Sequence, residues 1–260
     1  MKIVRDRIEI AFRDEGEGLP VVLLHGFPFS SRMWNRQVAA LAPSHRMITP
    51  DFRGFGDSGG APSSAEQLAD DLQALVEHLE LPRFVLGGFS MGGYVAFRYL
   101  AKHADRVHAV MLLDTRAEAD APEAKQRRYT AIDRIKSEGA DGFLNDFAKL
   151  VLSPKTLERR PEIATQVRQL MEADRVASLI GGLQAIAERP DSTPLLSKIT
   201  QPALIVVGED DKATPVDSAR KMHEAIPGST LVIIPEAGHV SNLEQPEQFN
   251  KALREFLAQV

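Results

Sequence analysis

Gly88-Phe89-Ser90-Met91-Gly92 decides the fold, because it lies between an apolar run at 84–86 and a helix-forming segment at 91–102. We interpret the run as a buried strand and the segment as a helix. A serine between glycines at a strand-to-helix junction is typical of a nucleophile elbow, a sharp turn that lifts the hydroxyl clear of the sheet. Such a pentapeptide arises by chance in about 0.07 chains of this length at average composition. The hypothesis therefore depends on finding partners for Ser90 elsewhere in the chain.

Composition excludes several classes of protein and site. The 260 residues are 43% hydrophobic and 26% charged, with a formal net charge of −5 and no cysteine. The acidic balance and the lack of a basic patch argue against a nucleic-acid partner. Without cysteine there is no disulfide, thiolate metal site or cysteine nucleophile. The charged N-terminus does not suit a signal peptide, and no apolar run reaches the length of a membrane span. We expect a soluble, cytoplasmic protein with no membrane partner, present as a monomer or homodimer.

Short apolar runs alternate with helical patterns along most of the chain. Helical spacing begins after Ser64, in the pattern of a capping box, and again after Pro246. The predicted strands after the first 20 residues are 21–24, 46–49, 84–86, 107–113, 203–207 and 231–234. Strands alternating with helices of this length predict a mostly parallel sheet with right-handed crossovers.

One long segment breaks the alternation. Residues 122–188 contain helix-like pieces and no convincing strand pattern, and a proline-rich stretch at 189–194 follows them. We therefore predict a core domain made of residues 1–115 and 195–260. Residues 116–194 are predicted to form a helical insertion.

A serine hydroxyl needs a neighbouring base to become a nucleophile at neutral pH, and histidine is the usual base. Of the seven histidines, His239 stands out because it lies in a loop directly after the predicted strand 231–234. Loops at the carboxyl ends of strands carry the ligand chemistry of α/β sheets. His25 also follows a strand, but we expect it to brace its loop. The other five are expected to be structural or surface residues: His45, His78, His103, His108 and His223.

The base needs a carboxylate that fixes its tautomer and stabilises the imidazolium. Gly208-Glu209-Asp210-Asp211 follows another predicted strand and supplies three candidates, of which Asp211 lies nearest the following helix. Asp114 also ends a strand and competes with Asp211. We favour Asp211 and keep Asp114, Asp210 and Glu209 as alternatives.

An oxyanion hole requires two backbone N–H groups aimed at the developing negative charge. The amide of Met91, directly after Ser90 and at the start of a helix, is one candidate. Phe27, in the segment His25-Gly26-Phe27-Pro28, is the other, since Pro28 has no N–H.

Four separated segments together resemble the α/β-hydrolase family across nearly the whole chain: 25–28, 51–58, 88–92 and 238–239. The resemblance implies a mostly parallel central sheet flanked by helices, with a helical cap inserted after the sixth strand. It also implies a structural role for the glycine-rich loop 51–58. The chain order Ser90, Asp211, His239 matches the family's catalytic triad, and the spacing from Gly208 matches its acid position.

In detail the chain is most similar to bacterial carboxylesterases and enol-lactone hydrolases. The resemblance implies a carboxylesterase that acts on a small-molecule ester through an acyl-enzyme, with no metal and no cofactor. Enol-lactone hydrolysis and cofactor-free perhydrolysis of the haloperoxidase type are the alternatives, and a ligand receptor with a retained triad is the non-enzymatic one. Ser90 argues against dehalogenases and epoxide hydrolases of this fold, which use an aspartate at the elbow.

Pocket residues are harder to choose. Gly26, Phe27, Trp34 and Met91 lie near the motifs and are candidates for substrate binding, although packing of its own helix explains Trp34 equally well. A capped, largely apolar cleft favours small uncharged esters.

Overall fold

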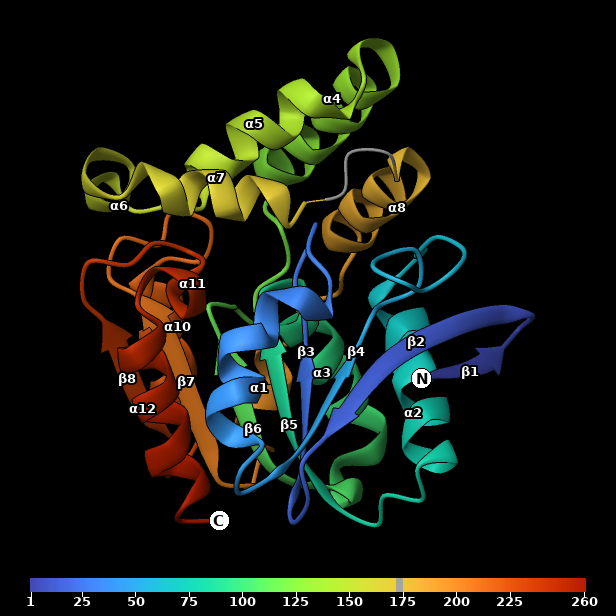
Figure 1. Cartoon of the computed structure of the whole chain (residues 1–260), viewed down its shortest axis with the longest axis vertical. Coiled ribbons are helices and arrows are strands. Elements are labelled where there is room, and N and C mark those ends of the chain that lie inside the picture. The colour runs from blue at the N-terminus through green and yellow to red at the C-terminus, as the bar shows by residue number, and fades with distance from the viewer. Residues whose placement is uncertain (172–174) are drawn as a thin grey trace.

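The computed structural model describes residues 1–171 and 175–260, and an eight-stranded sheet forms its centre (Figure 1). The strand order is β1-β2-β4-β3-β5-β6-β7-β8, and all pairs are parallel except β1 with β2 and β2 with β4. The strands are β1 (Lys2–Arg5), β2 (Ile8–Glu15), β3 (Pro20–Leu24), β4 (Arg46–Pro50), β5 (Phe84–Phe89), β6 (Val107–Leu113), β7 (Ala203–Gly208) and β8 (Thr230–Ile234). The predicted α/β fold with a mostly parallel sheet is confirmed.

The central strands are continuous apolar runs because helices cover both faces of the sheet. Every residue of β5 and β7 is buried. β5 pairs with β3 on one side and with β6 on the other, and Leu24 lies opposite Gly88. The elbow therefore begins at the carboxyl end of a strand in the middle of the sheet.

Helices pack on both faces of this sheet. α1 and α12 contact each other in front of it, whereas α2 and α3 contact each other on the other side (Figure 1). As predicted, Ser64 caps α2, its hydroxyl accepting a hydrogen bond from the Gln67 N–H at 3.1 Å. The helices of the core are η1 (Ser31–Trp34), α1 (Asn35–Leu41), α2 (Ala65–His78), α3 (Met91–His103), η2 (Ala104–Arg106), α10 (Val216–Ala225), α11 (Ser241–Glu244) and α12 (Pro246–Leu257).

Between β6 and β7, the described part of the chain contains helices and no strand. These helices are α4 (Pro122–Glu138), α5 (Ala140–Leu150), α6 (Pro154–Arg159), α7 (Pro161–Gln169), α8 (Val176–Ala187) and α9 (Thr193–Leu196). Helices α4 to α7 lie across the carboxyl edge of the sheet (Figure 1). The insertion follows the sixth strand, as expected. The assignment of residues 116–194 to a separate domain stays a prediction.

The predicted linker at 189–194 is partly ordered. α9 begins inside it, at Thr193. Arg189 is only 4% exposed, and its guanidinium donates to the carbonyls of Ile186 and Glu118. Composition identified a break in periodicity here, but it missed the anchoring that tertiary contacts provide.

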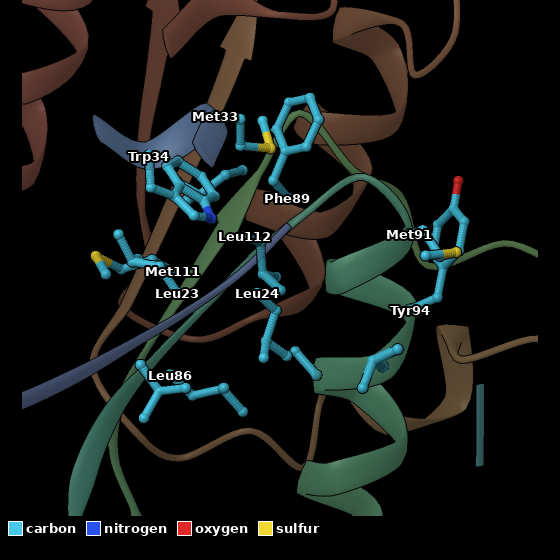
Figure 2. Close-up of a cluster of buried hydrophobic side chains, with 14 of the residues drawn as sticks. Leu23, Leu24, Met33, Trp34, Leu86, Phe89, Met91, Tyr94, Met111 and Leu112 are labelled. Carbon is cyan, nitrogen blue, oxygen red and sulfur yellow. The ribbon is translucent and has the colours of Figure 1, made fainter. Parts of the chain in front are cut away.

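The buried hydrophobic residues form one continuous core that extends around the sheet. Trp34, Met33 and Phe89 lie together near the top of β5, and Met91 lies beside Tyr94 on α3 (Figure 2). None of the helices in residues 1–171 and 175–260 combines the length and apolar character that crossing a bilayer requires.

Candidate active site

Ser90 occupies a strained turn between β5 and α3. Its φ of 50° and ψ of −114° lie outside the conformations that a residue with a side chain ordinarily adopts. A Cβ on Gly88 would lie 2.4 Å from the Gly92 carbonyl oxygen, and one on Gly92 would lie 2.5 Å from the Leu24 carbonyl oxygen. Both glycines are required because backbone passes directly against them. The turn has the geometry of a nucleophile elbow.

Three separated residues meet in one hydrogen-bonded chain at the elbow. His239 Nε2 lies 2.8 Å from Ser90 Oγ, and His239 Nδ1 lies 2.8 Å from Asp211 Oδ2. Since Asp211 is an acceptor, Nδ1 carries the proton and Nε2 is free to accept one from the serine. The three residues are 9% exposed or less, so water has little access to the chain.

Asp211 is held as a carboxylate. Its Oδ1 accepts hydrogen bonds from the Ala213 and Thr214 N–H groups at 2.8 and 2.9 Å, and its Oδ2 accepts one from the Thr214 hydroxyl at 2.6 Å. Burial tends to raise the pKa of Asp211, but His239 and the bonds from Thr214 outweigh burial and hold the pKa below its ordinary value. Sequence reasoning overlooked Thr214, although a threonine three residues after an aspartate is a common local hydrogen-bonding pattern.

The competing acid, Asp114, has other partners. Its Oδ1 accepts a hydrogen bond from the Gly208 N–H at 2.8 Å, and its Oδ2 accepts one from the Ser241 hydroxyl at 2.5 Å. Burial and the nearby charge of Asp211 raise its pKa well above the ordinary value. The side chain links β6 to β7 and α11, and only Asp211 among the proposed acids contacts His239 in the described residues.

The proposed oxyanion donors belong to the residue that follows Ser90 and to the residue that follows Gly26. Met91 is the first residue of α3, and Gly26 lies so close to the elbow that a Cβ there would be 3.0 Å from Ser90 Cβ. Within residues 1–171 and 175–260, neither the Phe27 nor the Met91 N–H donates a hydrogen bond. Oxyanion stabilisation requires N–H groups that are free to bind the developing charge, so both remain candidates for it.

His25 and the loop 51–58 form a brace beneath these groups. His25 Nδ1 lies 3.0 Å from the Gly26 carbonyl oxygen, and Nε2 accepts the Phe52 N–H at 2.8 Å. Asp51 accepts hydrogen bonds from the N–H groups of Ser31 and Asp57. Both ring nitrogens of His25 are engaged with backbone, so the structural interpretation of this histidine fits the contacts.

Glu244 holds the loop that carries His239, and sequence reasoning missed it. Its carboxylate accepts hydrogen bonds from the Gly238 N–H at 2.7 Å and from the Ser153 N–H at 2.9 Å. The His239 N–H donates in turn to the Val151 carbonyl at 2.8 Å. The segment between α5 and α6 thus fixes the histidine loop through a buried carboxylate. Although Gly238 is only six residues from Glu244, Ser153 is 91 residues away, and no local pattern in the sequence signals that contact.

The predicted substrate-binding residues divide into two groups. Trp34 is fully buried and packs its ring against Phe89 and Phe249, so the core-packing interpretation describes it and we withdraw it as a substrate contact. The ring of Phe27, in contrast, faces the inserted helices, with ring centroids 6.2 Å from Phe143 and 5.8 Å from Phe147. Gly26, Phe27 and Met91 remain candidates at the base of the insertion.

Comparison with known proteins agrees with this architecture. A model of the alpha/beta hydrolase fold family matches residues 20–246. A thermophilic esterase from Thermogutta terrifontis superposes with a TM-score of 0.93 at 41% identity, over 97% of this chain and 94% of that one. The 3-oxoadipate enol-lactonase 2 of Acinetobacter baylyi is 31% identical over 85% of this chain and 82% of its own length. A putative non-heme chloroperoxidase of Synechocystis is 34% identical over 96% and 95%. The elbow, the sheet and these relatives together show that the chain belongs to the α/β-hydrolase family.

Proposed function

We propose that this protein is a serine hydrolase that cleaves small carboxylic esters through an acyl-enzyme on Ser90. The observation that supports the proposal best is the unbroken chain from Ser90 through His239 to Asp211, with both contacts at 2.8 Å. A hydroxyl, a correctly protonated imidazole and a buried carboxylate in this order are the parts of a serine nucleophile.

In the first half of the proposed reaction, Ser90 Oγ attacks the ester carbonyl while its proton passes to His239 Nε2. The carbonyl oxygen becomes an oxyanion, which the N–H groups of Phe27 and Met91 stabilise. When the tetrahedral intermediate collapses, the C–O bond of the ester breaks. The departing alkoxide takes the proton from His239 and leaves as an alcohol.

In the second half, a water molecule attacks the acyl-enzyme and gives one proton to His239 Nε2. A second tetrahedral intermediate forms against the same two N–H groups. Its collapse releases the carboxylic acid, and the proton returns to Ser90. Throughout, Asp211 keeps the Nδ1–H of His239 in place and stabilises the imidazolium.

Enol-lactone hydrolysis is the second candidate, favoured by the likeness to the Acinetobacter baylyi enol-lactonase. It uses the same groups, except that the leaving enolate belongs to the same molecule as the acyl group. The acyl-enzyme therefore carries both, and deacylation releases a single ring-opened acid. Perhydrolysis is a further candidate because of the likeness to the putative chloroperoxidase. It differs only in that a peroxide replaces water in the second half of the reaction.

The test compares wild-type protein with Ser90→Ala on p-nitrophenyl acetate by stopped-flow absorbance. We expect a burst of p-nitrophenolate followed by steady turnover in the wild type, and neither in the variant. Turnover by Ser90→Ala would refute the nucleophile assignment. A single stoichiometric release that then stalls would favour the receptor alternative. A screen of p-nitrophenyl esters against lactones then separates the two enzymatic candidates.

A further inference from the structure

A cavity of about 440 Å³ opens between the inserted helices and the loop that carries Asp211. Its walls come from α4, α5, α8 and residues 212–215. Its lining residues are of two kinds. The apolar residues, which we call the apolar wall, are Ala124, Ala131, Phe143, Phe147, Leu150, Leu183, Ala213 and Pro215, and the cations, which we call the cationic wall, are Arg116, Arg127, Arg128 and Lys212. Among the described residues that line it there are four cations and no carboxylate.

Lining residues of this cavity contact two parts of the proposed reaction site. Lys212 directly follows Asp211, and the Ala213 N–H donates to Asp211 Oδ1 at 2.8 Å. On the other side, the Phe143 and Phe147 rings that line the cavity pack on Phe27. The lining residues therefore contact both the acid loop and the oxyanion loop, while Ser90, His239 and Phe27 are not among the described residues that line the cavity.

The positive charge of the wall is only partly neutralised. The buried carboxylate of Asp120 pairs with Arg116 at 2.5 Å, with Arg128 at 3.2 Å and with Arg189 at 2.9 Å. Burial tends to raise the pKa of Asp120, but the charges of Arg189 and Arg128 outweigh it and lower the pKa, so the group is ionised.

One carboxylate thus faces three guanidinium groups, and Arg116 Nε is buried without a hydrogen-bond partner in the described residues. Arg127 and Lys212 add two exposed cations to the same wall. Neither has an ion-pair partner among the residues that the structure describes. The chain as a whole has a net charge of −5, so this cluster of unneutralised cations around one cavity is a local positive region. A positive region of this kind attracts a bound anion.

We propose that the cationic wall binds a carboxylate at the end of the substrate remote from the scissile ester, while the apolar wall holds the connecting carbon chain. The inference rests on the proposed function and narrows its substrate class to monoanionic esters or lactones. It replaces the sequence-based expectation of uncharged esters. Leu150 is 49% exposed although it is apolar. In this arrangement it contacts the carbon chain as part of the apolar wall.

The test compares substrates that differ only in charge. One pair is p-nitrophenyl hydrogen adipate and its methyl ester, with the carboxylate on the acyl side; the other is 4-acetoxybutanoate and its methyl ester, with it on the alcohol side. The measured quantity is the ratio of kcat/KM for the anion to kcat/KM for the neutral ester. We expect a ratio above one in at least one pair, falling as salt screens the exposed cations.

The variant is Arg127→Gln with Lys212→Gln, which leaves the three arginines around Asp120 intact. The matched control is Lys136→Gln, which removes one exposed cation from the same helix, α4, outside the cavity. Charge-assisted hydrogen bonds are strong enough that we expect the ratio to fall about tenfold in the double variant. In the control we expect the wild-type ratio. A ratio that is the same in wild type, double variant and control overturns the inference.

A binding measurement separates failure of this inference from failure of the proposed function. Isothermal titration of monomethyl adipate into Ser90→Ala protein requires no turnover. Weaker binding after Arg127→Gln and Lys212→Gln are added supports the anion site even if no ester is hydrolysed. Equal binding overturns it, even if neutral esters are hydrolysed efficiently.

Discussion

Replacing Glu244 by glutamine tests whether the histidine loop depends on a buried carboxylate. Glu244 is fully buried, and its two carboxylate oxygens accept the N–H groups of Gly238 and Ser153 at 2.7 and 2.9 Å. Glutamine has nearly the same shape, but it presents an NH₂ donor in place of one oxygen. One backbone N–H then faces another donor and loses its acceptor.

The magnitude follows from that one lost acceptor. Leaving a buried N–H group unpaired lowers the free energy of unfolding by about 1–3 kcal/mol. For a chain of this size such a loss lowers the Tm by about 2–4 °C for each kcal/mol. Because Gly238 directly precedes His239, the displaced loop also lengthens the contact between His239 and Ser90, and kcat falls with little change in KM.

Differential scanning calorimetry and p-nitrophenyl acetate kinetics measure the two effects. The matched control is Glu247→Gln, which makes the same chemical change at an exposed position on α12. We expect the control to match the wild type in Tm and kcat. If Glu244→Gln also matches the wild type in both, the carboxylate does not hold the histidine loop and the reasoning is refuted.

Asp211→Asn should lower kcat by about 10⁴, as loss of the correct histidine tautomer does in serine hydrolases, whereas Asp114→Asn should retain far more activity; the reverse ranking in ester hydrolysis would reassign the acid. Burial lowers the pKa of His25, although the nearby charge of Asp51 opposes the shift. As the pH falls, the unfolded chain therefore binds a proton at this histidine before the folded protein does. The free energy of unfolding is unaffected by His25 above about pH 6.5 and falls by at most about 1.4 kcal/mol per pH unit below it. Urea titrations from pH 5 to 8 should show this slope, and His25→Gln should remove its share; an unchanged slope contradicts the assignment. Gly92→Ala should destabilise the fold by about 1–3 kcal/mol or more through overpacking, because its Cβ would lie 2.5 Å from the backbone oxygen of Leu24; a wild-type urea midpoint would contradict the tight turn.

The alternation of strands and helices could be predicted because it depends on local patterns. Strands covered on both faces are continuous apolar runs, and Val107–Leu113 was predicted with the bounds that the structure has. The prediction of a linker at 189–194 was incomplete, because Arg189 is anchored by residues that are distant in the sequence, such as Asp120. The local pattern contains no information about such partners.

The candidate site shows the same division. Ser90, Asp211 and His239 each follow a strand, and the carboxyl ends of parallel strands meet at one edge of the sheet. Their order and position could therefore be read from the chain. Trp34 was ambiguous for the opposite reason, since an aromatic residue near a motif packs into a core or a pocket according to what lies opposite it. Phe249, more than 200 residues away, faces it here.

By itself, the sequence determined the elbow at Ser90, the family and the strand ends that carry His239 and the candidate acids, because each depends on a turn or a strand end that short-range steric rules impose. Only the tertiary structure decided that Asp211, and not Asp114, faces His239, and that Glu244 holds the histidine loop. It alone also gathered Arg116, Arg127, Arg128 and Lys212 around one cavity. Hydrogen bonds and charges act over a few ångströms in space, so they depend on which distant segments the packed helices bring together.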